Sequence, residues 1–126
     1  MSSTGSAWFV MGAIAGGIAV VLGAFGAHGL KSRVDPELLV VFETGARYQM
    51  YHALALLAVG LARVHWPTAM ISLAGWFFLA GIVIFSGSLY LMTATGARWL
   101  GAITPIGGVA FILGWILLAV GAWREI

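Results

Sequence analysis

The sequence predicts an all-α membrane protein, a bundle of four transmembrane helices in which neighbouring spans run antiparallel. Apolar residues make up 62% of the 126-residue chain and charged residues only 8%, and the mean hydropathy is +1.05. Soluble domains carry about 25% charged residues, so lipid is the expected solvent. Four apolar stretches with short polar connections fill nearly the whole chain. A single membrane domain over residues 1–126 is therefore expected.

Charge and cysteine content exclude several functional classes. The net charge is +2, and the six Lys and Arg residues stand singly along the chain. Without a basic run, no nucleic-acid partner is expected, and the lipid bilayer is the principal environment. Cysteine is absent, which excludes disulfides, thiolate metal sites and redox switches. No cofactor and no bound metal are expected.

The first span is predicted at residues 7–27, after Ser6 as a helix N-cap. The start of the chain carries no Lys or Arg before this span, so a cleaved signal peptide is not expected. Small residues recur along the span at helical spacing and allow another helix to approach closely. They are Gly12, Gly16, Ala19, Gly23 and Ala27.

The second span is the polar one. Asp35 and Pro36 are typical of a helix start, and the span itself is predicted at residues 43–62. Only 15 uncharged residues run from Tyr48 to Ala62, enough for roughly 22 Å of helix against a hydrocarbon thickness of ~30 Å. The span is therefore expected to draw Arg47 and Glu43 to or below the membrane interface.

The third and fourth spans are predicted at residues 68–92 and 103–123, the latter with Thr104 as cap and Pro105 in its first turn. The short connection at residues 63–67 makes spans two and three antiparallel neighbours. Four spans place three tryptophans on one membrane face and Trp99 on the other, as in an aromatic belt. The three are Trp8, Trp66 and Trp123.

Basic residues predict the orientation by a small margin. The face with the first and third connections carries Lys31, Arg33 and Arg98, with Arg47 nearby, whereas the opposite face carries Arg63 and Arg124. Cytoplasmic loops are enriched in Lys and Arg. Both termini are therefore predicted on the non-cytoplasmic side.

A polar cluster is predicted where the first two spans meet. Glu43 and Arg47 are four residues apart on one helix and are expected to pair, because an unpaired charge in the bilayer is costly. Tyr48 and His52 share the same spacing, Gln49 lies beside them, and His28 ends the first span. The cluster is interpreted either as a site that binds or passes a small solute or ion, or as a set of hydrogen bonds that fixes helix register. Its members are His28, Glu43, Arg47, Tyr48, Gln49 and His52.

A second polar patch is predicted at the far end of the third span. Ser86, Ser88 and Tyr90 share a membrane face with Thr104, and Gly107 would permit close approach of the fourth span. No hydroxyl has a recognisable base at fixed spacing, so an enzyme is not expected. Ligation of haem by His28 and His52 is disfavoured because the two histidines are expected at different depths. A bound metal is disfavoured because thiolates and a carboxylate pair at metal-ligand spacing are missing.

Four motifs together resemble one family of small bacterial inner-membrane proteins of uncharacterised function, the YgdD/YwdK-like family, which has mitochondrial relatives. The motifs are GAFGAHGLK at residues 23–31, FETGARYQMYHA at 42–53, FSGSLY at 85–90 and ITPIGG at 103–108. The resemblance implies a four-helix protein of the inner membrane, and it identifies no catalytic residue or substrate.

The predicted function is an integral membrane protein whose polar cluster binds or passes a small solute or ion. The alternative is a structural or accessory subunit of a larger membrane complex, in which the cluster only fixes register. Self-association into a homo-oligomer is expected in addition, because a bundle this small buries little of its helical surface.

Overall fold

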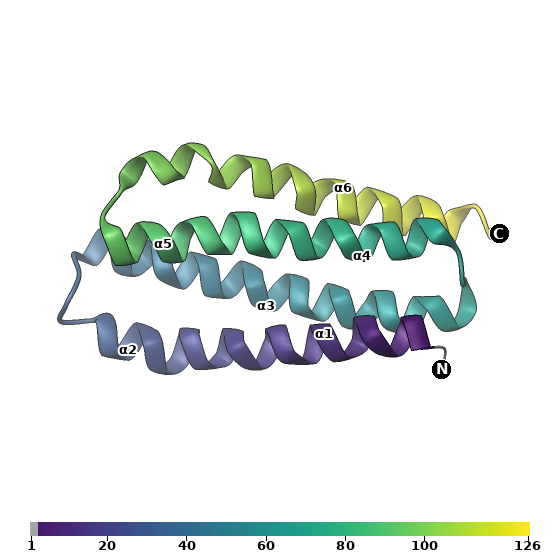
Figure 1. Cartoon of the computed structure of the whole chain (residues 1–126), viewed down its shortest axis with the longest axis horizontal. Helices are drawn as coiled ribbons and strands as arrows, with labels where there is room; N and C mark the ends of the chain where they lie inside the picture. Colours follow the sequence, from purple (N-terminus) through teal and green to yellow (C-terminus); the bar gives the residue numbers. More distant parts are fainter. Residues whose placement is uncertain (1–2) are drawn as a thin grey trace.

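The computed structural model describes residues 3–126, and these residues form helices and short connections with no strand among them. The helices join end to end into four rods (Figure 1). Rod 1 contains α1 (Ser3–Val20), the π-helical η1 (Val21–Gly26) and α2 (Ala27–Leu30). Rod 2 is α3 (Pro36–His65). Rod 3 contains α4 (Ala69–Gly81), the π-helical η2 (Ile82–Ser86) and α5 (Gly87–Thr95), and rod 4 contains the 3-10 helix η3 (Arg98–Ala102) and α6 (Thr104–Trp123).

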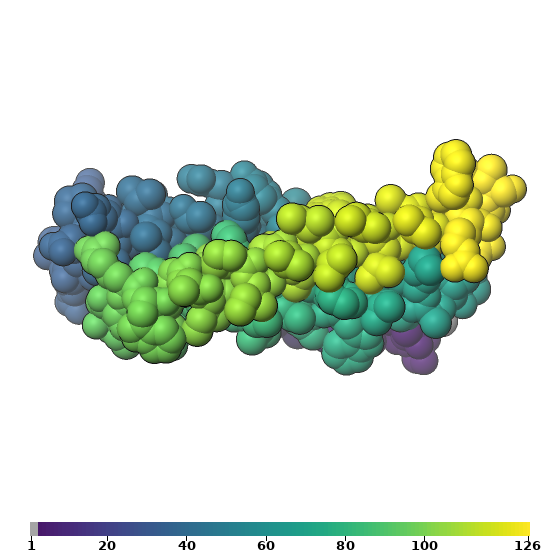
Figure 2. All heavy atoms as spheres, turned by 90° about the horizontal axis from the view of Figure 1, so that it is seen from above, coloured from purple at the N-terminus to yellow at the C-terminus, as the bar shows by residue number. Residues whose placement is uncertain are grey.

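Consecutive rods run in opposite directions and lie side by side (Figure 1). The two ends of the chain lie at one end of the molecule, together with the connection between α3 and α4. α1 packs on α3, α6 packs on α4, and α3 packs on both α4 and α5. The molecule is elongated, and α6 runs along much of the face in Figure 2. Rods 1 and 4 therefore hold the outer positions, with rods 2 and 3 between them.

Three of the four rods are long and apolar enough to cross a membrane. They are Ser3–Leu30, Ala69–Thr95 and Arg98–Trp123. The 30-residue α3, which carries Glu43 and Arg47, does not reach the same apolarity. The structure thus agrees with the sequence in making the second rod the polar one.

Local sequence explains most helix boundaries. Asp35 occupies the N-cap of α3 and Pro36 its first position, although the Asp35 side chain makes no capping hydrogen bond. The Thr68 hydroxyl accepts a 3.4 Å hydrogen bond from the Ile71 backbone N–H at the start of α4. Gly96 ends α5 with a φ of 72°, a left-handed conformation that glycine adopts without strain.

Several predicted details need correction. Rod 1 is already helical at Ser3, so Ser6 lies inside α1 and caps nothing. Ile103 holds the N-cap of α6, and Thr104 is the first helical residue. Trp8 is only 2% exposed, because its indole packs against Gly75 and edge-on to Trp76, with ring centroids 5.0 Å apart. Trp8 is therefore a core residue, whereas Trp99 and Trp123 are exposed as a belt requires.

The rods approach one another closely where glycine removes the side chain. A Cβ added to Gly12 in α1 would lie 2.8 Å from the Ala53 carbonyl oxygen of α3. A Cβ on Gly107 in α6 would lie 2.4 Å from the backbone nitrogen of Phe85 in η2. These backbone contacts set the depth and rotation of rods 1 and 4 against their neighbours.

Candidate functional site

Gln49 joins three rods. Its side-chain Nε2 donates to the carbonyl oxygen of Ala15 in α1 at 2.9 Å. Its Oε1 accepts from the Tyr90 hydroxyl of α5 at 2.7 Å. Gln49 itself is 5% exposed on α3. A single amide therefore links the outer rod 1 to rod 3 through rod 2.

His52 lies one turn further along α3, inside an aromatic cage. Its Nδ1 lies 2.7 Å from the Tyr48 carbonyl oxygen, which can only accept, so Nδ1 carries the proton. Its Nε2 accepts from the indole N–H of Trp115 in α6 at 3.1 Å. The ring stacks on Phe111, with centroids 3.5 Å apart and planes within 6°. Both nitrogens of a neutral imidazole are thus occupied by protein groups.

The second polar patch divides between two contacts. The buried Ser86 hydroxyl donates to the Gly45 carbonyl oxygen of α3 at 2.7 Å, which ties η2 to rod 2. The Ser88 and Thr104 hydroxyls lie 2.6 Å apart and join α5 to the start of α6. The predicted proximity of Ser88 and Thr104 is confirmed. Tyr90 lies beside Ser86, as predicted, and its hydroxyl also donates to Gln49.

Glu43 and Arg47 lie apart from this interior network. Both line a groove of about 370 Å³ between rod 1 and α3, together with Ala19, Gly23, Ala46, Met50 and Tyr51. Glu43 is half-buried and Arg47 exposed. Within residues 3–126, no ion pair joins Glu43 to Arg47, so the predicted pair does not form. The i, i+4 spacing permits such a contact but does not require it.

His28 and Tyr48 also differ from their predicted places. His28 is exposed near the end of rod 1, and within residues 3–126 no hydrogen bond joins its ring to another member of the predicted cluster. The Tyr48 ring stacks on Phe85 at a centroid distance of 4.8 Å, at the edge of the aromatic cage. Tyr48 contributes its backbone carbonyl, rather than its hydroxyl, to His52.

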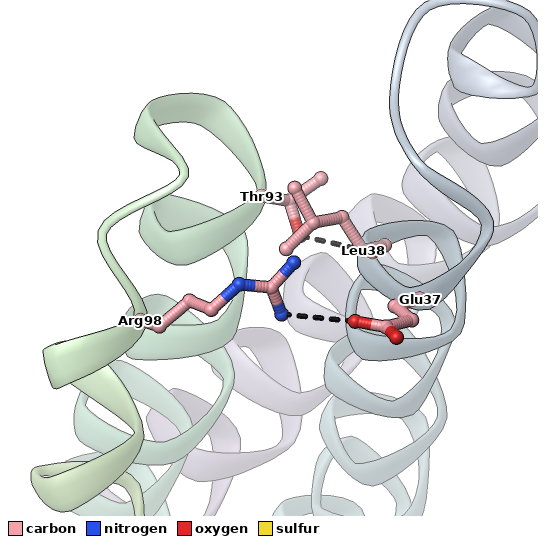
Figure 3. A network of polar contacts seen from close by, with 4 residues as sticks. All are labelled: Glu37, Leu38, Thr93 and Arg98. Carbon is pink, nitrogen blue, oxygen red and sulfur yellow. Dashed lines mark hydrogen bonds and ion pairs between the residues drawn. The ribbon is translucent and has the colours of Figure 1, made fainter.

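The ion pair that the structure does contain lies at the end of the rods. Arg98 Nη1 lies 3.2 Å from Glu37 Oε2, and the two side chains are 56% and 78% exposed (Figure 3). Beside them the Thr93 hydroxyl donates to the Leu38 carbonyl oxygen at 3.3 Å. An exposed pair of this kind contributes little to stability.

The hydrogen-bond partners of the buried polar residues indicate what these residues do. Each buried polar side chain in the described residues has a hydrogen-bond partner on another rod or on its own helix backbone. These five are Gln49, His52, Ser86, Ser88 and Thr93. No group of three His, Asp or Glu side chains gathers within residues 3–126 where a metal ion could be held. The side chains of these five residues are thus occupied by contacts within the bundle. The buried Nε of Arg63 has no hydrogen-bond partner among the described residues, although the Nη1 of the same side chain donates to the Thr68 carbonyl oxygen at 2.6 Å.

Two partners of the interior network carry no polar signal in the sequence. Ala15 contributes only a backbone carbonyl, and Gly45 does the same. A third partner, Trp115, does have a polar N–H group, but nothing in the sequence of its apolar span indicates which acceptor this group would contact. Such partners could be found only from the relative rotation of the rods.

Comparison with known proteins places the chain in a family. The family model described as "Protein of unknown function (DUF423)" matches residues 22–108. The UPF0382 membrane protein YwdK of Bacillus subtilis (strain 168) is 50% identical over 116 residues, covering 91% of this chain and 94% of its own. A UPF0382 membrane protein of Staphylococcus saprophyticus is 46% identical over 118 residues, covering 93% of this chain and 97% of its own. No solved structure matches.

The matched region contains Gln49, His52, Glu43 and Arg47, so the polar residues of α3 lie inside the part that defines the family. Relatives of nearly equal length are named membrane proteins, in agreement with the three apolar rods. The chain belongs to the DUF423 family, whose named relatives are UPF0382 membrane proteins.

Proposed function

We propose that this protein is an accessory subunit of a larger membrane protein complex. Its four rods, α3 included, cross the bilayer, and the groove beside Glu43 and Arg47 docks a partner protein. The interior hydrogen bonds then fix helix register and have no part in catalysis or conduction. The observation that carries the proposal is a contrast between two sets of residues. Five buried polar residues have hydrogen-bonded side chains, whereas Glu43 and Arg47 at the groove form no ion pair within residues 3–126.

The length of α3 supports burial of both charges. Its 30 residues extend about 45 Å, so a centred hydrocarbon layer of ~30 Å covers about 20 residues around its middle. Glu43 and Arg47 fall inside that interval. An isolated charge there costs at least ~2.5 kcal/mol, and a partner carrying the opposite charges would recover part of that cost.

The shape of the groove also favours a helix as its occupant. Three small residues, Ala19, Gly23 and Ala46, are part of its lining and would let a partner backbone approach closely. Gly23 belongs to the π-helical η1, and π-helical turns occur frequently at functional sites.

We further propose the inner membrane as the location, with both termini on its non-cytoplasmic side. The bulk of the basic residues then lies at the end that holds Lys31, Arg33 and Arg98, which the positive-inside rule assigns to the cytoplasm. The family resemblance favours the inner membrane.

Gentle extraction of native membranes followed by native electrophoresis tests the docking function. We expect the wild type to migrate with a larger assembly and the variant Glu43→Gln/Arg47→Gln to be released from it. The matched control, Glu37→Gln/Arg98→Gln, removes the same two charges from the exposed pair and should leave the assembly intact. A single-chain band for the wild type, or an assembly unaffected by the groove variant, would refute the proposal.

Binding or passage of a small solute or ion is the second candidate, favoured by the presence of both charge signs in one groove of about 370 Å³. Purified protein in liposomes distinguishes it from docking. Flux above empty vesicles that Glu43→Ala abolishes would support passage, whereas docking predicts no flux for either protein.

A further inference from the structure

We infer that the partner in the groove is a second copy of this chain, joined by two reciprocal ion pairs between Glu43 of each copy and Arg47 of the other. The inference rests on the proposed docking function and names its partner. It requires that the two charges be free within one copy, that they be self-complementary, and that their surroundings accept a helix.

The two charges are free within one copy. Glu43 is half-buried on α3, Arg47 is exposed one turn away, and neither forms an ion pair within residues 3–126. Glu37 and Arg98, a carboxylate and a guanidinium near this end of the molecule, already pair with each other at 3.2 Å. The groove therefore presents one unpaired negative and one unpaired positive group.

In a dimer with a two-fold axis along the membrane normal, the charges of the groove on one copy face the opposite charges of the same groove on the other copy. In such a dimer a residue i of one copy meets j of the other, and j meets i, so a single Glu–Arg combination gives two pairs. The two residues differ in height by four residues, about 6 Å of helix, which an extended Arg side chain can span. Both copies keep the same orientation in the bilayer, as insertion in a single direction requires.

The surroundings of the two charges suit contact between helices. The small residues Ala19, Gly23 and Ala46 line the groove, and Met50 and Tyr51 add apolar surface to its lining. Ion pairs closed off by such residues in lipid experience a low dielectric and are stronger than pairs in water. Charge complementarity thus favours a second copy over an unrelated apolar helix, which would leave both charges unpaired.

Charge reversal gives a decisive experiment. Glu43→Arg makes the groove doubly positive and Arg47→Glu makes it doubly negative, so each variant should repel itself. Mixed together, the two variants should pair, because each positive group again faces a negative one. The chain has no cysteine, so Ser32→Cys offers a unique labelling site for energy transfer between copies in lipid vesicles.

We expect efficient energy transfer for the wild type and self-association weakened by roughly 30-fold or more for each single variant. Transfer should return when the two variants are mixed, and also in the swapped chain Glu43→Arg/Arg47→Glu. Return of transfer on mixing shows that both variants fold. The control Glu37→Gln should match the wild type.

Two outcomes would overturn the inference. Wild-type copies that show no transfer at any lipid dilution are monomeric, and if native extracts still contain a larger assembly, docking stands while its partner is a different protein. Single variants that fail to recover on mixing would show that the charges do not meet across copies. Retained phospholipid that Arg47→Glu releases, without any change in transfer, would assign the groove to a lipid headgroup instead.

Discussion

Replacing Gly107 with alanine is expected to destabilise the protein by about 3 kcal/mol, the largest effect of a single methyl group in this structure. The added Cβ would lie 2.4 Å from the backbone nitrogen of Phe85 and 2.8 Å from its Cα. Backbone atoms cannot rotate away as a flexible side chain can, so α6 must separate from η2. Titration of unfolding with SDS in mixed micelles measures the loss.

Gly17→Ala is the matched control for this prediction. Gly17 also lies within a helix, but nothing lies within 4 Å of its hypothetical Cβ. Alanine there should leave stability unchanged or raise it slightly, because alanine favours the helix more than glycine does. Equal losses for the two variants would mean that rods 3 and 4 do not meet at Gly107.

Replacing Gln49 with leucine is expected to cost about 2 kcal/mol, because it removes two interhelical hydrogen bonds and takes the side-chain donor away from the Ala15 carbonyl oxygen. The same substitution removes the hydrogen bond that the Ala15 carbonyl oxygen of rod 1 accepts and the hydrogen bond that the Tyr90 hydroxyl of rod 3 donates. Rod 1 should therefore separate at lower SDS than in the wild type, and protease access to the connection at residues 31–34 should rise.

A double-mutant cycle isolates the contact between rods 2 and 3. Gln49→Leu and Tyr90→Phe should be coupled by about 1 kcal/mol, since either change alone already breaks their shared bond. Gln49→Leu with Thr93→Val is the control, because Thr93 bonds to Leu38 and Leu89 rather than to Gln49. Additive losses for Gln49 and Tyr90 would contradict the observed 2.7 Å bond.

The sequence predicts the number and order of the rods well, and the reason is physical. Three rods are apolar enough to be recognised from composition alone, and Asp35 with Pro36 marks the start of α3 through local capping chemistry. The second rod is also recognisable as the polar one, because its uncharged stretch is short. These features depend on residues close together in the chain.

Contacts between rods depend on rotation and depth, which the sequence does not state. The spacing of Glu43 and Arg47 permits a pair, yet the pair does not form, because α3 turns Gln49 and His52 inward and leaves Glu43 and Arg47 at the outer groove. His28 belongs to the separate motif at residues 23–31 and is exposed near the end of rod 1. Which polar residues meet is set by backbone contacts such as those at Gly12 and Gly107.

The central claim is that Arg47 lies in the docking groove, within the membrane and outside the packed interior of the bundle. Single cysteines introduced into this cysteine-free chain test that claim. Arg47→Cys, Ser32→Cys and Ala53→Cys are compared in lipid vesicles with a membrane-impermeant maleimide. Ser32 is exposed in the connection after rod 1, whereas Ala53 is buried in α3 at 1% exposure.

Reaction rates before and after mild detergent are the decisive measurement. We expect the cysteine at position 32 to react in intact vesicles, the one at 47 to react only once detergent removes the lipid, and the one at 53 to stay unreactive in both. Reaction at position 47 in intact vesicles as fast as at position 32 would place Arg47 in water. The groove would then have no charge in the membrane to neutralise.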